Sequence, residues 1–318
     1  MAPAGYGDKV EGIHAVTAAL AAGRVSELYV ERSRRSRMAP VLEALDEPNV
    51  QYVDDVRPMA DTDAPQGVVA RCRPIQPVTL ESLAGEDAAI LVLDHIEDPH
   101  NAGAAARSAR AAGLGGMVVS SRRAAPLSST AFKAAAGALE RLPVAVVGSI
   151  PEALSHLKDL GVWIVGLDAE GEQSLFGLDL LTEPVAVVIG SEGSGLAELT
   201  RKRCDLLVSI PMAMGTDSLN ASVSAALASF EIMRTRTATI QGQAALAQLV
   251  EQLICNQQVV GSTPARGSIR GNPGFQTPLS EVWRPEVVGI GRPVIAARAD
   301  EPQNPPDRWG CPLPFWRC

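Results

Sequence analysis

Short apolar runs alternate with helical segments between residues 88 and 210, and this alternation restricts the fold more than any other feature of the chain. The first run, Ala88 to Leu93, is apolar at every position, as expected of a strand that is covered on both faces of a sheet. Because parallel strands need a crossover connection, the alternation predicts an α/β domain with a mostly parallel sheet. Its later strands are expected at 117–120, 144–147, 163–168, 185–190 and 206–210, and its helices at 102–112, 129–138 and 150–159.

A dinucleotide-binding domain is one alternative for a sheet of this kind. Such a domain carries G-x-G-x-x-G directly after its first strand. Here the first strand is followed by D-H-I-E-D-P-H-N, which contains no glycine. The sequence therefore gives no support to a dinucleotide site.

The chain before this domain has a different organisation. Residues 8–72 are predicted to form a small separate α/β domain, in which helices and strands alternate over short distances. Residues 73–83 contain two prolines and no clear period, so we interpret them as a stiff linker, with the second domain at 84–236. Within the first domain, helices are expected at 12–22 and 38–45, and strands at 27–31, 50–53 and 67–70.

Residues 237–318 are expected to be a disordered tail. Only Ala244 to Ile254 shows helical periodicity, and the rest is rich in proline and arginine without a core-forming pattern. The stretch N-Q-Q-V-V-G-S-T-P-A-R-G-S is similar to a translated tRNA gene. Our hypothesis is that the natural enzyme ends near Arg236 and that the reading frame continues into a neighbouring gene. The alternative is a genuine disordered tail that binds RNA.

Composition limits the class of protein. A net charge of −8 argues against nucleic-acid binding over the whole surface, but it leaves room for local basic clusters. The five cysteines form no CxxC pair, which predicts neither a metal site nor a disulfide framework. No apolar run is long enough for a membrane span and no signal peptide is evident, so we expect a cytoplasmic protein. Arginine-rich clusters occur at 32–37, 71–73, 122–123 and 201–203.

The segment from Ser209 to Glu231 predicts a strand, a loop and a helix in succession. Pro211 ends the strand because it cannot donate a ladder hydrogen bond. Ser218 is a good N-cap for the helix that follows, whose apolar residues have helical spacing. Polar side chains at such a junction are either ordinary caps or ligand contacts, because free backbone N–H groups gather there.

Three motifs together resemble the SpoU branch of the SPOUT RNA methyltransferases. The first is N-x-G-x-x-x-R from Asn101, the second is G-S-E-G-x-G-L from Gly190, and the third is I-P-M followed by S-L-N-x-S from Ser218. The resemblance covers roughly residues 8 to 236 and is closest to bacterial enzymes that methylate a guanosine 2′-hydroxyl of 23S rRNA. It implies an N-terminal substrate-binding domain similar to ribosomal protein L30e, and a deep C-terminal trefoil knot in the second domain.

The resemblance also implies the cofactor and the site residues. S-adenosylmethionine would bind in the knot, near Gly190, Gly193 and Gly195, whose access to positive φ would let the backbone approach it closely. The matching arginine, Arg107, would act on the 2′-hydroxyl and its adjacent phosphate. Asn101 would cap the helix of the first motif and bond across to the other loops. The expected cofactor contacts are Gly190, Gly193, Ile210, Met212 and Leu219, and the catalytic set is Asn101, Arg107, Glu192, Ser218 and Asn220.

Two other functions stay open at this point. One is a tRNA 2′-O-methyltransferase, and the other is an RNA-binding protein that keeps the fold without activity. RNA is the expected partner in each case, with no role for DNA, membrane or metal. The family further implies a homodimer, because SPOUT domains pair through helices near the knot.

Overall fold

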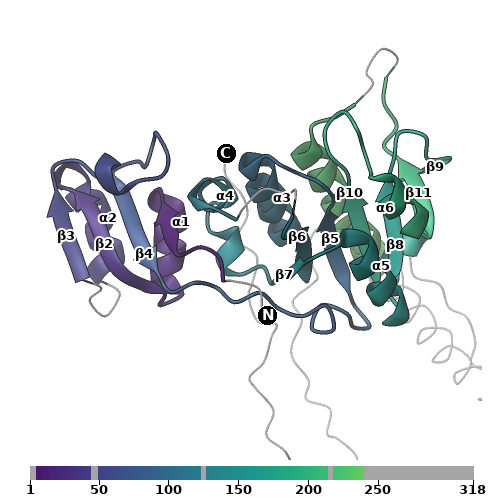
Figure 1. The fold of residues 1–318 in the computed structure, drawn as a ribbon, viewed down its shortest axis with the longest axis horizontal. Coiled ribbons are helices and arrows are strands. Elements are labelled where there is room, and N and C mark those ends of the chain that lie inside the picture. The colour runs from purple at the N-terminus through teal and green to yellow at the C-terminus, as the bar shows by residue number, and fades with distance from the viewer. Residues whose placement is uncertain (1–4, 44–48, 123–126, 214–217, 240–318) are drawn as a thin grey trace, which may run out of the picture. The chain divides into compact units, whose positions relative to one another are not determined.

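The computed structural model describes residues 5–43, 49–122, 127–213 and 218–239 (Figure 1). Within these residues the strands form two sheets, one of four strands and one of seven. No helix in the described ranges is long and apolar enough to cross a membrane. The expectations for residues 240–318 lie outside this part of the chain.

The seven-stranded sheet is parallel at every pairing between its described strands. Its order is β7-β6-β5-β10-β8-β11-β9, so β5 and β10 lie at the centre. This confirms the predicted α/β domain with a mostly parallel sheet. The strands are β5 (Ala89–Leu93), β6 (Gly116–Ser120), β7 (Val144–Val147), β8 (Trp163–Leu167), β9 (Gln173–Ser174), β10 (Val185–Ile189) and β11 (Leu206–Ser209).

Helices cover both faces of this sheet because successive side chains of a strand point to opposite faces. Leu91 of β5 packs in one apolar cluster with α3 and with the helix of residues 221–239. Its neighbour Val92 packs in a second cluster with α5. Continuous apolar strands are therefore required, as the runs in the sequence indicate. The helices are α3 (Pro99–Ala111), α4 (Ser129–Ala135), α5 (Ile150–Asp159) and α6 (Glu198–Arg203).

The smaller sheet has the order β1-β4-β2-β3 and is mixed, with β2 parallel to β3 and antiparallel to β4. Buried residues of α1, among them Val16 and Leu20, pack in the same apolar cluster as Leu28 of β2. The elements are β1 (Lys9–Glu11), α1 (Ile13–Ala21), β2 (Val25–Glu31), α2 (Arg35–Glu43), β3 (Asn49–Val53) and β4 (Val68–Cys72).

Arg236 anchors the helix of residues 221–239 to the larger sheet. Its guanidinium donates to the backbone carbonyls of Leu181 at 3.0 Å, Asp87 at 2.9 Å, Ala88 at 2.8 Å and Glu183 at 2.7 Å. Desolvation lowers the pKa of this guanidinium below its ordinary value. The helix continues through residue 239, beyond the predicted domain end at 236.

Candidate functional site

The three sequence motifs meet at the carboxyl edge of the parallel sheet. Strands β5, β8, β10 and β11 all end there, and the residues that follow them supply the loops of the site. Ligands of open α/β sheets bind at this edge, because the loops leave free backbone groups there. The motifs are far apart in sequence but share one place in the fold.

The loop after β10 is shaped by three glycines, for two different reasons. Gly193 and Gly195 have φ angles of 84° and 66°, which other residues rarely adopt. Gly190 does not need a positive φ; a Cβ there would collide with the backbone of Gly195 and Leu196. The expectation of positive φ is therefore right for Gly193 and Gly195 and wrong for Gly190, where close backbone approach is the reason.

Glu192 joins all three motifs through a single carboxylate oxygen. Its Oε1 accepts a hydrogen bond from Asn101 Nδ2 at 2.8 Å and another from Asn220 Nδ2 at 2.6 Å. The Asn220 amide also donates to Asn101 Oδ1 at 3.0 Å. We refer to Asn101, Glu192 and Asn220 as the Glu192 cluster.

Hydrogen bonds to the backbone fix the orientation of the Asn220 side chain. Its Oδ1 accepts from the backbone N–H groups of Ser222 at 2.8 Å and Val223 at 3.4 Å, so Asn220 caps the helix of residues 221–239. Its Nδ2 is thereby directed at Glu192. The prediction that Ser218 caps this helix is wrong, because the helix begins later and Asn220 takes the position.

The helix α3 is capped by Asp98, not by Asn101. Asp98 Oδ1 accepts from the backbone N–H of His100 at 2.8 Å, and Pro99 occupies the first turn. The expectation that Asn101 caps α3 is therefore wrong. Its side chain is left to bond Glu192 and Asn220.

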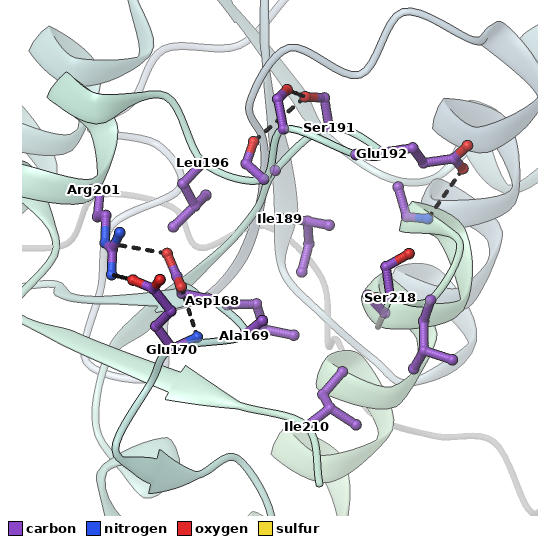
Figure 2. A pocket seen from close by; sticks show the side chains of 18 of the residues that line it. Asp168, Ala169, Glu170, Ile189, Ser191, Glu192, Leu196, Arg201, Ile210 and Ser218 are labelled. Atoms are coloured by element: carbon purple, nitrogen blue, oxygen red, sulfur yellow. Dashed lines mark hydrogen bonds and ion pairs between the residues drawn. The ribbon is translucent and has the colours of Figure 1, made fainter. Parts of the chain in front are cut away.

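A cavity of about 420 Å³ lies between these loops (Figure 2). All five predicted cofactor contacts line it, and so do Glu192 and Ser218 from the predicted catalytic set. Apolar side chains such as Ile189 and Ile210 line one part, and the glycine loop lines another. Arg201, from the basic cluster at 201–203, and Ala221, within the third motif, also line it. The lining further includes residues that the sequence did not indicate: Leu167, Asp168, Ala169, Glu170 and Ser224.

Arg201 and two carboxylates form a second polar cluster on another side of the cavity (Figure 2). Arg201 Nε lies 3.2 Å from Asp168 Oδ2, and its terminal nitrogen lies 2.8 Å from Glu170 Oε2. The hydrogen bond with Glu170 and the charge of Asp168 raise the pKa of the Arg201 guanidinium. We refer to Asp168, Glu170 and Arg201 as the Arg201 cluster; no motif in the sequence pointed to it.

A second cavity, of about 770 Å³, adjoins the first on the side of α3. Asn101 and Glu192 line it, together with His95. His95 has a φ of 56° and its Nδ1 lies 2.6 Å from the buried Asp94 carboxylate, which also accepts from the Ala197 N–H at 2.9 Å. Six residues line both cavities: Ser191, Glu192, Ser194, Gly195, Leu196 and Ala221.

Arg107 lies apart from the other predicted catalytic residues. It is exposed on α3 and lines neither cavity. Arg107 lies six residues after Asn101. At 3.6 residues per turn, this offset places the two side chains on different faces of the helix. The structure thus brings Asn101, Glu192 and Asn220 together, with Ser218 on the same cavity, and leaves Arg107 outside.

In the described part of the chain, no group of three or more His, Cys, Asp or Glu side chains is placed to hold a metal ion. Burial raises the pKa of the Cys204 thiol to about 12, so it stays protonated and unreactive at neutral pH.

The cavity fits a nucleoside-like ligand with a polar tail. The close approach of the Gly190 and Gly195 backbones makes a wall without side chains, while Ile210 and Leu219 offer apolar surface for a flat ring. Carboxylates and hydroxyls of Glu170, Glu192 and Ser218 can accept hydrogen bonds from hydroxyl or ammonium groups.

Two family models match the chain. Residues 88–230 match the SpoU rRNA Methylase family, and residues 9–78 match the RNA 2'-O ribose methyltransferase substrate binding family. The two matches fall on the seven-stranded and the four-stranded sheet respectively.

The match to curated relatives spans nearly the whole length of those proteins. A 23S rRNA (guanosine-2'-O-)-methyltransferase RlmB of Ralstonia nicotianae is 39% identical over 238 residues, which are 71% of this chain and 95% of that protein. The RlmB of Escherichia coli is 36% identical over 247 residues, 72% of this chain and 99% of that protein. Among solved structures, the SpoU methyltransferase AviRb from Streptomyces viridochromogenes, in complex with the cofactor AdoMet, has a TM-score of 0.64 and 28% identity, covering 72% of this chain and 90% of that one.

Proposed function

The chain belongs to the SpoU rRNA methylase family, and from this premise we propose that it transfers the methyl group of S-adenosylmethionine to the ribose 2′-hydroxyl of a guanosine in 23S rRNA. The observation that carries the proposal is the Glu192 cluster, in which one carboxylate joins the three motifs beside the cavity. Relatives named for this reaction are matched over nearly their whole length.

The cavity of about 420 Å³ is the proposed site of S-adenosylmethionine, which supplies an activated methyl group when bound. The backbone at Gly190 and Gly193 would approach the cofactor closely, while Ile210 and Leu219 would contact the adenine. Met212 lines the cavity with an exposed side chain. The structure of AviRb in complex with AdoMet supports the identity of the cofactor.

The adjoining cavity is the proposed entrance for the acceptor nucleotide. Asn101 and Glu192 lie in its wall and would hold the ribose beside the cofactor cavity. Ser218, on the cofactor side, would add one hydrogen bond to the ribose. Positioning of two reactants in this way supplies much of the rate enhancement of a group transfer.

Arg107 is the proposed activating residue. Its planar guanidinium would stabilise negative charge on the hydroxyl oxygen and the adjacent phosphate. Its place on the exposed face of α3, outside both cavities, favours an arrangement in which it approaches the cavity of a second protomer.

We therefore propose a homodimer formed through the helix of residues 221–239. Three apolar side chains of this helix are exposed, namely Val223 at 45%, Phe230 at 44% and Met233 at 39%. They follow helical spacing, and exposed apolar stripes of this kind mark association surfaces. The helix begins at the Glu192 cluster, so a partner packed on it lies close to the site.

Mixing two inactive variants tests both the dimer and the role of Arg107. If Arg107 acts on the partner's cavity, Arg107→Ala mixed with Asn220→Ala regains up to about a quarter of wild-type activity, because half of the dimers carry one intact site. Light scattering should give a dimer for each variant. No regain of activity in a confirmed dimer, or an active monomer, would contradict the arrangement.

We include two finer features of the fold in the same proposal, the trefoil knot and the L30e-like N-terminal domain. A trefoil knot is supported by the path of the chain, which pairs β11 beside β8 and then returns to bond Asn220 to Glu192 and Asn101. An L30e-like role for the four-stranded sheet is supported by the substrate-binding family match. A cytoplasmic location belongs to the proposal as well, and the rRNA substrate named for its relatives supports it.

Mapping 2′-O-methylation across total RNA, with and without the gene, tests the proposed function. The expected result is the loss of one guanosine methylation in 23S rRNA, restored by the wild-type protein. Loss of a tRNA methylation would identify the other substrate class. No lost methylation would favour an RNA-binding protein without activity.

A further inference from the structure

Arg201 is the one cationic side chain among the described residues that line the cofactor cavity. It belongs to α6, which follows the glycine loop of the second motif. Its two bonded carboxylates, Asp168 and Glu170, come from the segment after β8. Figure 2 shows the guanidinium directed at both carboxylates.

The segment from Asp168 to Gly171 is also held against β11. The Asp168 N–H donates to the Val208 carbonyl at 2.9 Å, and the Glu170 N–H donates to Asp168 Oδ1 at 2.9 Å. A Cβ on Gly171 would collide with the Val208 backbone, so the two segments lie in close contact. Arg201 thereby connects α6 with a segment that rests on β11.

These connected segments are three walls of one cavity. Leu167 to Glu170 form one wall, Ile210 follows β11 in the second, and the glycine loop leads into α6 in the third. We propose that Arg201 is a positioning residue for the cofactor, which holds these walls at the spacing that S-adenosylmethionine requires. This inference rests on the proposed function in one respect, namely that the cavity binds that cofactor.

The Arg201 cluster contributes little to global stability. The Arg201–Glu170 ion pair joins side chains that are 40% and 76% exposed, so it adds little to the free energy of unfolding. The Asp168 side chain is 13% exposed, but its carboxylate keeps the hydrogen bond from the Glu170 N–H when Arg201 is removed. The parallel sheet and its two apolar clusters hold the domain together without them. Loss of Arg201 therefore frees one cavity wall without unfolding the chain, which separates positioning from stability.

Calorimetric titration of the full-length protein with S-adenosylmethionine measures the predicted effect. Arg201→Ala should raise the Kd about tenfold, because the wall must then be ordered by the ligand. Single-turnover methylation of a 23S rRNA fragment at saturating cofactor should stay within about twofold of wild type, because the acceptor side is untouched. Arg201→Lys should give an intermediate Kd, since a point charge can hold only one carboxylate well.

Lys202→Ala is the matched control. Lys202 neighbours Arg201 on α6 but pairs only with Glu198 at 2.6 Å, in an exposed i,i+4 contact. Its substitution should leave the Kd unchanged, and all variants should melt within a few degrees of wild type.

A wild-type Kd for Arg201→Ala would overturn the inference, and so would a slower saturated rate with an unchanged Kd. Should Arg201→Ala fold poorly, Glu170→Gln tests the same wall from an exposed position, and a Kd identical to wild type would then be the contradicting result. If the wild-type protein itself bound no S-adenosylmethionine, the proposed function would fail together with this inference.

Discussion

The Glu192 cluster and the Arg201 cluster both reach the cofactor cavity, the first through Glu192 alone, yet they are built from different chemistry. In the Glu192 cluster, two neutral amides donate to one carboxylate, and two of its members, Asn101 and Glu192, line the adjoining cavity. In the Arg201 cluster, one cation joins two carboxylates, and none of its members lines the adjoining cavity. The first cluster thus faces both proposed substrates, and the second faces the cofactor alone.

This difference separates two tasks that a group-transfer enzyme must perform. A change on the acceptor side should alter the rate of the saturated complex, whereas a change on the cofactor side should alter cofactor affinity. The geometry supports this division of tasks. Glu192 bonds Asn101 of α3, which lines the adjoining cavity, and Asn220, which caps the helix of residues 221–239.

The largest expected effect belongs to Arg107, which should behave as an acceptor-side residue. Arg107→Ala should lower kcat by about 10²-fold or more, as expected when a charge beside the reacting phosphate is removed. Its Kd for S-adenosylmethionine should stay at the wild-type value, because Arg107 lines neither cavity of its own protomer and is proposed to act on the acceptor at the partner's cavity. Arg107→Lys should restore little. Calorimetry and single-turnover kinetics report the two quantities; loss of cofactor binding would remove Arg107 from the acceptor side.

Glu192→Gln should have the next largest effect. The substitution keeps the shape of the side chain but replaces charge-assisted hydrogen bonds with neutral ones, so the single-turnover rate should fall about tenfold. Glu152→Gln in the first turn of α5 is a control on the opposite face of the sheet and should have no effect. An unchanged rate for Glu192→Gln would show that the charge of the cluster is dispensable.

Ser218→Ala should be milder than either. It removes one hydroxyl from the cofactor cavity and no hydrogen bond of the Glu192 cluster. A cost of ~1 kcal/mol in the saturated rate is about fivefold. Single-turnover kinetics of the two variants gives the rates to compare. A loss as large as that of Arg107→Ala would indicate a direct part for Ser218 in proton transfer.

Removal of residues 240–318 should have the smallest effect. Both clusters are complete between residues 101 and 220, and Arg236 holds the helix of residues 221–239 to the sheet. Cofactor Kd and single-turnover rate should therefore stay within about twofold of the full-length values, since the removed sequence has no core-forming pattern outside Ala244 to Ile254. A truncated protein that fails to fold would show that the removed residues dock on the domain.

Much of the larger sheet could be predicted from the sequence, because buried strands in a parallel sheet must be apolar on both faces. The predicted run at 185–190 matches β10 at Val185–Ile189, and the run at 144–147 matches β7. Short elements were missed, since β9 has two residues and α6 has six, too few for a period to emerge.

The site residues could be predicted from the sequence only where they belong to one of the three motifs. Local sequence cannot distinguish Ser218 from Asn220 as a cap, because both residue types suit that position; Asn220 takes it in the structure, with its other amide atom bonded to Glu192. For the Arg201 cluster the sequence showed only the basic residues at 201–203, since the two carboxylates come from a different element and meet Arg201 only after the sheet has formed.

The most direct test of the division between the clusters compares Glu192→Gln with Arg201→Ala in one pair of measurements. For each variant, calorimetry gives the Kd for S-adenosylmethionine, and single-turnover methylation of a 23S rRNA fragment gives the rate at saturating cofactor. We predict a slower rate with a near wild-type Kd for Glu192→Gln, and a raised Kd with a near wild-type rate for Arg201→Ala. If both variants changed the same quantity, the two clusters would not divide the tasks of the cavity.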